Sequence, residues 1–206
     1  MRPLLIAALF IGLTAPAFAA SFEQGQRPFE GWIGACRMDG YCSASTGASV
    51  EAEHLTSGAI LRVARQAQQT YWEVSLTTIA APADERYPIV ATVDKDRIGE
   101  FSPPTDIGAF GSRIDFYFLG SKAQALMDRL VAGKSLTFDF MATDNTAQRA
   151  TFRLAGLAQA LIWIDTAQHR IGSERVAEAP PYGLFRTDLV GAAWMEPALA
   201  YFFFAH

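Results

Sequence analysis

The side chains that most often act in catalysis or metal binding at neutral pH are scarce in this chain. Its 206 residues include three histidines and two cysteines. His54 follows Glu51 and Glu53, which are metal-binding residue types, but successive residues of a polar loop rarely converge on one ion without further ligands. His169 stands near the end of a predicted helix, where a protonated imidazole interacts favourably with the helix dipole. We therefore predict no metal site, no bound cofactor and no catalytic histidine.

Paired carboxylates are a second source of acid–base chemistry. Asp94 and Asp96 flank Lys95 in a predicted turn, which favours a hydrated connection. Asp139 and Asp144 are candidates only because they are two carboxylates near each other in the sequence. The chain contains no Gly-x-Ser-x-Gly nucleophile motif, no Walker loop, no dinucleotide-binding glycine motif and no zinc-protease motif. The sequence predicts no catalytic residue, and an enzyme of unfamiliar type stays an alternative.

Asp165, Gln168 and Arg170 form the polar group that most resembles an active site. Asp165 and Gln168 lie three positions apart on a predicted helix, so they occupy neighbouring surface positions. Arg170 follows where the helix gives way to Gly172, and its guanidinium can offer paired donors to the carboxylate or to the last helix carbonyls. We interpret the group as a structural latch that fixes the helix end. The alternative is a polar ligand site.

Cys36 and Cys42 are the two cysteines, and we expect them to form one disulfide. The Asp39-Gly40 pair between them is typical of a hairpin turn, which brings its two arms within cross-linking distance. Disulfides persist in oxidising compartments outside the cytosol. The alternative, a Cys-x5-Cys metal or redox site, lacks a second ligand pair and the Cys-x-x-Cys spacing.

Residues 1–19 are typical of a secretory signal peptide. They combine Arg2, an apolar run over residues 4–13 and the small residues Ala17 and Ala19 before a cleavage site. The apolar run is shorter than the roughly 20 residues of a membrane-spanning helix. We predict export to the periplasm or the medium. Cleavage after Ala19 removes only Arg2 from the 17 basic and 21 acidic residues, and the resulting net charge of −5 argues against a nucleic-acid partner.

Alternation of apolar and polar residues between positions 59 and 154 predicts strands with one buried face. The apolar phase comprises Trp72, Val74, Leu76, Ile89, Ala91, Val93, Ile114, Phe116, Phe118, Leu136, Phe138, Phe140, Ala150, Phe152 and Leu154. Such strands, joined by short polar turns, indicate antiparallel sheets that share one core. The predicted fold class is mainly β (α+β), an antiparallel β-sandwich-like domain with two helices.

The two helices are predicted from capping and helical spacing. Ser121 and Gln124 predict a capping box at the start of the first helix, and Gly133 predicts its end. We expect this helix to cover a sheet face or an open end. The second helix is predicted over residues 156–169, with a wide apolar face that should be well buried.

We expect one domain over residues 20–176, followed by a linker and tail over residues 177–206. The tail opens with Pro180-Pro181 and is apolar over residues 189–204. It could make weak contact with a membrane surface, but Glu196-Pro197 interrupts the apolar run, which favours packing on its own domain.

Several stretches together resemble two known protein families. Those that resemble the invasion-associated locus B family are, in order, Trp32 with Cys36 and Cys42, then residues 61–63, 130–138 and 154–160. The continuation over residues 160–165, with Gln168, Arg170 and Gly172, is similar to a second family of periplasmic proteins whose function is unknown. The resemblance covers roughly residues 31–176. It implies a β-rich, sandwich-like domain with helices that is exported to the periplasm.

We expect an exported periplasmic binding or accessory protein without catalytic activity, in envelope maintenance or host association. Its expected partner is an unidentified periplasmic or envelope protein. The alternative is a cell-wall-directed enzyme or enzyme inhibitor that acts through the irregular loop 102–111 and through exposed aromatic side chains such as Phe110 and Tyr117.

Overall fold

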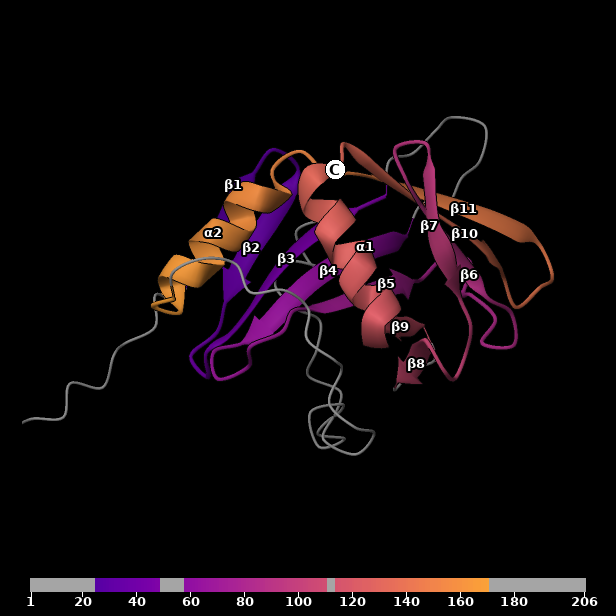
Figure 1. The fold of residues 1–206 in the computed structure, drawn as a ribbon, viewed down its shortest axis with the longest axis horizontal. Helices are drawn as coiled ribbons and strands as arrows, with labels where there is room; N and C mark the ends of the chain where they lie inside the picture. The colour runs from indigo at the N-terminus through magenta and orange to yellow at the C-terminus, as the bar shows by residue number, and fades with distance from the viewer. Residues whose placement is uncertain (1–24, 49–57, 111–113, 171–206) are drawn as a thin grey trace, which may run out of the picture.

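The structure is a computed structural model that describes residues 25–48, 58–110 and 114–170. Within these ranges, eleven strands form two antiparallel sheets (Figure 1). The larger sheet has the order β1 (Gly25–Phe29), β2 (Trp32–Cys36), β3 (Tyr41–Gly47), β4 (Ala59–Gln66), β5 (Glu73–Thr78), β9 (Asp115–Phe118) and β8 (Ile107–Phe110). The smaller sheet has the order β11 (Ala147–Arg153), β10 (Ser135–Met141), β6 (Ile89–Val93) and β7 (Asp96–Phe101). With helices α1 (Gly120–Ala132) and α2 (Leu157–Ala167), this arrangement confirms the predicted fold class.

Aromatic side chains pack against one another between the two sheets. Phe118 of the larger sheet stacks on Phe138 of the smaller sheet, with ring centroids 5.0 Å apart. Phe101 meets Phe118 edge-on at 4.8 Å, and Phe152 meets Phe138 edge-on at 6.2 Å. Offset and edge-to-face pairs of this kind add to the stabilisation from burial. The shared core predicted for one set of strand positions is confirmed for Trp72, Val74, Leu76, Phe116, Phe138 and Phe152.

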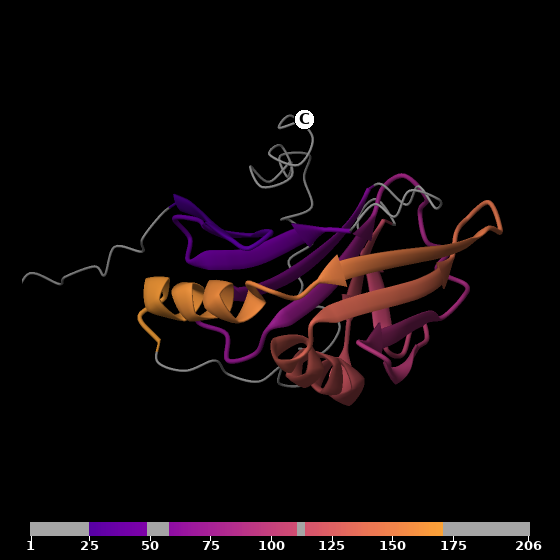
Figure 2. The ribbon, with the colours of Figure 1, turned by 90° about the horizontal axis from the view of Figure 1, so that it is seen from above.

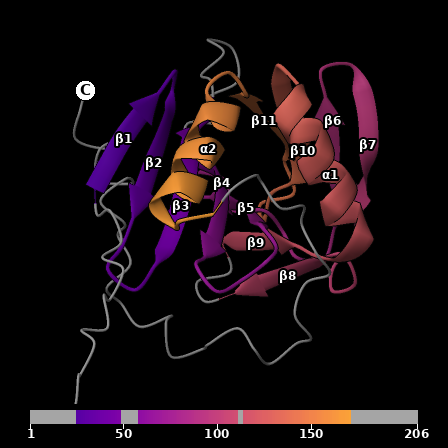
Figure 3. The same cartoon turned by 60° about the vertical axis from the view of Figure 1, so that its left-hand side comes forward.

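Helix α1 packs on β6 and β7 of the smaller sheet and also contacts α2 (Figure 3). Its buried side chains are Ala123, Leu126, Met127 and Leu130. The predicted capping box of Ser121 and Gln124 is wrong, because the helix begins at Gly120, its N-cap is Leu119, and no side chain caps it. The chain enters the helix directly from β9, so Ser121 already lies inside the first turn.

Glycines fix the ends of both helices through close approach. At Gly133, just after α1, a Cβ atom would lie 2.5 Å from Val93 Cγ1. Gly156 precedes α2 with φ 96°, and a Cβ atom there would lie 2.1 Å from the carbonyl oxygen of Phe29. The second helix is shorter than its predicted span of 156–169, because Gln168 is its C-cap and His169 has φ 55°.

Helix α2 covers the part of the larger sheet that the smaller sheet leaves open. Figure 2 shows α2 along one side of the N-terminal strands, and it packs mainly on β2 and β3. Its buried side chains are Leu157, Ala160, Leu161, Trp163, Ile164, Asp165 and Ala167. One charged residue, Asp165, therefore belongs to the buried set. The expectations for residues 1–19 and 177–206 fall outside the described residues.

Candidate functional site

The β2–β3 hairpin carries the predicted disulfide. Cys36 and Cys42 are direct partners in the antiparallel register, with Cα atoms 4.1 Å apart and sulfur atoms 2.08 Å apart. The turn lies where the Asp39-Gly40 pair predicts it, and the N–H of Gly40 donates to the carbonyl of Arg37 at 3.1 Å. Both cysteines are buried. The disulfide therefore joins neighbouring strands beneath the end of α2.

A buried arginine lies beside this disulfide on the inner face of the larger sheet. Arg65 of β4 follows Leu61 and Val63 in the inward phase and is the register partner of Cys42. Its Cζ atom lies 4.0 Å from the ring centroid of Trp72, a cation–π geometry. The side chain of Arg65 has no solvent exposure. A charge in such a position requires hydrogen bonds and a counter-charge.

Asp165 and Gln168 supply those partners from α2. Arg65 Nη2 donates to Asp165 Oδ1, and Arg65 Nε and Nη2 donate to Gln168 Oε1 at 3.0 and 2.9 Å. Gln168 Nε2 donates to the carbonyl oxygens of Gly40 and Arg65 at 2.8 and 3.0 Å. The Gln168 amide thus connects the helix end to the guanidinium on one side and to the hairpin turn on the other.

Arg170, the third member of the predicted group, contacts another part of the sheet. Its Nη1 atom donates to the carbonyl of Gln69 in the β4–β5 connection, and its backbone N–H donates to the carbonyl of Asp165 at 2.6 Å. The structure brings Asp165 and Gln168 together around Arg65 and places the Arg170 guanidinium on the neighbouring connection. The roles of these side chains as a latch or a ligand site stay predictions.

Sequence reasoning missed Arg65. The available signal was a single charged residue in the inward phase of a strand whose other inward positions, Leu61 and Val63, are apolar. The side chain of Asp165 is 5% exposed, so the carboxylate is closed to solvent as well as ion-paired. This arrangement can attach α2 to β3 and β4, and it leaves little access for a substrate.

A second polar group lies on the opposite, outer face of the larger sheet. Ser45, Arg62, Ser75 and Tyr117 form one row across β3, β4, β5 and β9, because each is the register partner of the next. Arg62 Nε donates to Ser75 Oγ at 3.3 Å. Ser45 and Ser75 are buried, and Tyr117 is half-buried rather than exposed as we expected from the sequence.

Two titratable residues next to this row have altered protonation equilibria. Burial raises the pKa of Glu73, while a hydrogen bond with Gln69 and the charge of Arg62 oppose that effect. Burial and the charge of Glu73 raise the pKa of Tyr71 to about 12. Tyr71 therefore stays protonated at neutral pH, and ionisation of Glu73 is less favourable than in water.

The loop 102–111 is tied at its base to α1. Asp106 accepts hydrogen bonds from the backbone N–H of Ser102 at 3.1 Å and from Lys122 Nζ at 2.6 Å. Partial burial acts to raise the pKa of Asp106, but these hydrogen bonds and the charge of Lys122 lower it overall. Pro104 and Thr105 lie exposed at the loop tip. The irregular loop predicted over residues 102–111 is wrong in its second half, because residues 107–110 form β8 and pair with β9, and the sequence did not predict the ion pair at Asp106.

Two of the candidate acids act as structural acceptors. Asp94 Oδ1 accepts hydrogen bonds from the backbone N–H groups of Lys134 and Ser135 at 3.0 and 2.9 Å, and these hydrogen bonds lower its pKa. Asp139 forms an ion pair with Arg149 at 2.6 Å. In the part of the chain that the structure describes, no three His, Cys, Asp or Glu side chains gather closely enough to hold a metal ion.

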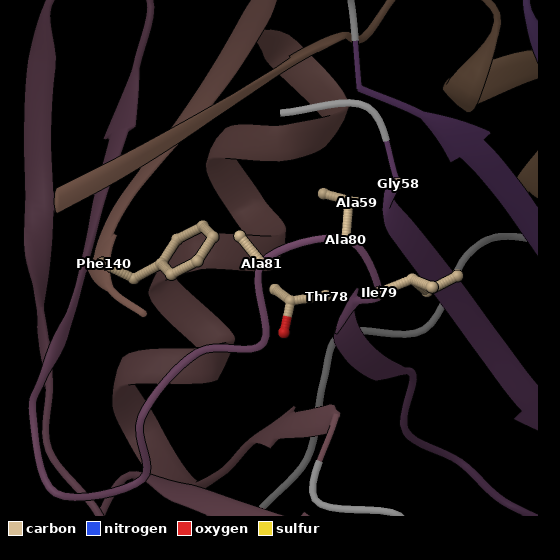
Figure 4. A pocket seen from close by; sticks show the side chains of 7 residues that line it. All are labelled: Gly58, Ala59, Thr78, Ile79, Ala80, Ala81 and Phe140. Carbon is tan, nitrogen blue, oxygen red and sulfur yellow. The ribbon is translucent and has the colours of Figure 1, made fainter. Parts of the chain in front are cut away.

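A small apolar pocket lies where β4 begins and β5 ends. It is a shallow, partly open depression without room for a water molecule, and it is lined by Gly58, Ala59, Thr78, Ile79, Ala80, Ala81 and Phe140 (Figure 4). The hydroxyl of Thr78, its one polar lining side chain, already accepts a hydrogen bond from the N–H of Ala83 at 2.9 Å. The pocket therefore offers mainly apolar contact.

Neither described helix is long and apolar enough to span a membrane.

Comparison with known proteins gives a likeness of fold. The crystal structure of invasion associated protein B from Bartonella henselae aligns with a TM-score of 0.52 and 16% sequence identity, over 71% of this chain and 100% of that one. At this identity the likeness concerns the fold alone, and at that level it supports the first family resemblance. No protein-family model matches the chain, and no curated protein matches it.

Proposed function

We propose that the chain is an exported binding or accessory domain of the cell envelope that catalyses no reaction. The observation that carries this proposal is the use of the buried Arg65, Asp165 and Gln168 cluster. These side chains would suit an active site by type, yet their hydrogen bonds join α2 to the sheet and to the disulfide-bonded hairpin. Such an arrangement supports a stable scaffold rather than turnover.

Export is supported by two independent features of the chain. The signal-like residues 1–19 predict translocation, and the Cys36–Cys42 disulfide fits an oxidising compartment. The solved neighbour is described as an invasion associated protein, which agrees with a role at the bacterial surface or envelope. We place the chain in the periplasm or outside the cell, with a protein of the envelope or of a host as its partner.

The exposed loop that Asp106 ties to α1 favours a second candidate, inhibition of a cell-wall enzyme. The Asp106–Lys122 ion pair holds the loop base, while Pro104 and Thr105 are exposed. A tip held in one conformation loses little entropy on binding and suits insertion into another protein's cleft.

A pair of assays separates these functions. Purified mature chain incubated with cell-wall sacculi should release no product that a heat-denatured sample does not release. A photo-cross-linking amino acid at Thr105 tests the loop in living cells, with Asn145 in the exposed β10–β11 turn as the matched control position.

Adducts with one cell-wall enzyme at Thr105, and none at Asn145, would favour the inhibitor. Adducts with an envelope protein that lacks cell-wall activity would support the accessory role. Release of product by the native chain, reduced in a chain with Asp106→Asn, would overturn the non-catalytic proposal.

A further inference from the structure

The outer face of the larger sheet is buried although no described element covers it. In Figure 2, α2 lies on one side of the purple strands, and no described helix or strand lies on the opposite side. Outer-face residues of β3, β4 and β5 are nevertheless nearly inaccessible, with exposed fractions between 1% and 6%. They are Ser43, Ser45, Ile60, Ala64, Ser75 and Thr77. Ile60 and Ala64 are buried but do not belong to the core between the sheets.

The shape of this face suits bulky side chains from elsewhere. Ser43 and Ala64 are register partners near its centre, and Ser45 and Ser75 flank Arg62 in the next row. We call the four small residues Ser43, Ser45, Ala64 and Ser75 the outer strip. A strip of small residues leaves space above the sheet that a large side chain can fill, and close packing favours such complementarity.

Two polar groups on this face bear on what could cover it. Ser45 Oγ is buried and has no hydrogen-bond partner among the described residues. A polar group in a segment packed over the face would satisfy this hydroxyl. The half-buried Glu73 at the end of β5 adjoins the same strip, as the register partner of Ala64. Its raised pKa reflects desolvation at this face.

The chain itself offers a suitable cover at the right place. Arg170, the last described residue, is bonded to Gln69 in the β4–β5 connection, so the chain leaves the described domain beside the strands that carry the outer strip. Residues 171–206 follow. Ten residues in extended form reach about 33 Å, which exceeds the width of five strands spaced about 4.8 Å apart.

The composition of residues 177–206 matches the strip. They include Phe185, Trp194 and the run 201–204, which reads Tyr-Phe-Phe-Phe. These bulky residues complement the small residues of the outer strip, and removal of aromatic side chains from water is favourable. A membrane-surface role would instead favour basic residues, and Arg186 is the single Lys or Arg in the segment.

We propose that residues 177–206 fold back over the outer face of β3, β4 and β5 and pack their aromatic side chains on the outer strip. The segment is then part of the domain and covers the Arg62 row, which directs partners to other surfaces such as the loop 102–111. The proposal does not depend on the proposed function, since an enzyme and an accessory protein could both carry it.

Intramolecular photo-cross-linking of the whole mature chain tests the proposal. Benzoylphenylalanine replaces Phe203 in one variant and Ile162, which is 64% exposed on α2, in the control. After illumination, peptide mass spectrometry should find position 203 joined to a peptide of β3, β4 or β5 in the same chain. The control at position 162, on the helix that covers the other face of the sheet, should give no such product.

A second variant checks the site of packing. Ala64→Trp fills the outer strip and should lower the Phe203 cross-link yield at least fivefold, whereas Thr137→Trp on the smaller sheet should not change it. Circular dichroism confirms that each variant is folded. The same reactions are repeated with vesicles of phosphatidylethanolamine and phosphatidylglycerol at three to one.

Several results would overturn the proposal. These are cross-links from Phe203 to lipid, cross-links to a second copy of the chain alone, and the absence of any product in the β3–β5 peptides. A yield that Ala64→Trp leaves unchanged would also contradict packing on the strip.

Discussion

Replacement of Asp165 by Asn keeps the side-chain size but leaves the guanidinium of Arg65 buried without its counter-charge. The side chains of Arg65 and Asp165 are 0% and 5% exposed. Two unit charges about 4 Å apart interact by about 4 kcal/mol at an effective dielectric constant of 20. Removal of one partner from a buried pair typically costs about 3 to 5 kcal/mol. We therefore expect Asp165→Asn to lower the free energy of unfolding by about 3 to 5 kcal/mol.

A double-mutant cycle isolates the interaction between the two residues. Arg65→Met and Asp165→Asn should each destabilise strongly, and the double variant should lose at least about 2 kcal/mol less than the sum, because both changes remove one contact. The matched control is the exposed Arg149–Asp139 pair, whose side chains are 67% and 38% exposed. Its coupling energy should be about 0.2 to 1 kcal/mol.

Urea denaturation followed by tryptophan fluorescence, with the disulfide intact, measures all these free energies. An Asp165→Asn loss below about 1 kcal/mol, or a coupling energy no larger than that of the control pair, would refute the structural reasoning. Variants that melt like the parent but lose a binding partner would instead make this cluster a ligand site.

Three further predictions concern single positions. Glu73→Gln should raise the melting temperature at pH 7, because the raised pKa of Glu73 makes its ionised form unfavourable in the folded state. This gain should vanish as the pH falls below 4.5, the usual pKa of a glutamate, because Glu73 is then protonated in both the folded and the unfolded state. A constant gain across pH 4 to 8 would contradict this origin. Phe138→Ala should cost about 3 to 5 kcal/mol in denaturant melts, and a loss under about 1 kcal/mol would show that its strand is misplaced. Gly156→Ala should cost at least about 2 kcal/mol, since it adds left-handed strain and a contact with Phe29; an unchanged melting temperature would argue against the N-cap geometry.

Strand phase was the most predictable part of the structure. In a strand, alternate side chains face opposite sides, so Trp72, Val74 and Leu76 had to share a face once their neighbours were polar. The same local logic placed the hairpin and its disulfide, because a turn and two flanking cysteines lie within a few residues of one another. These features depend on short-range geometry, which the sequence shows directly.

The partner of Asp165 could not be found in this way. Arg65 is 100 residues away in the chain, and only the packing of α2 on the sheet brings the two together. On its own, Arg65 interrupts an otherwise apolar phase and provides no indication of which residue neutralises it. The failed capping box at Ser121 has a related cause, because the route of the chain from β9 into α1 determines where the helix begins.

The alternation of apolar and polar residues also could not predict that the outer face of the larger sheet is buried. Ser43, Ser45 and Ser75 occupy the polar phase of their strands, which normally predicts exposure to water. Their burial depends on what lies over the sheet, and residue type alone does not encode that cover.

The intact mass of the chain recovered from the periplasm of its native cell is the sharpest test of export. Mass spectrometry with and without reductant gives both the position of the first residue and the state of Cys36 and Cys42. We expect a chain that begins at Ala20 and gains two hydrogens on reduction. A chain that retains residues 1–19 in the cytosol, with two free thiols, would contradict it.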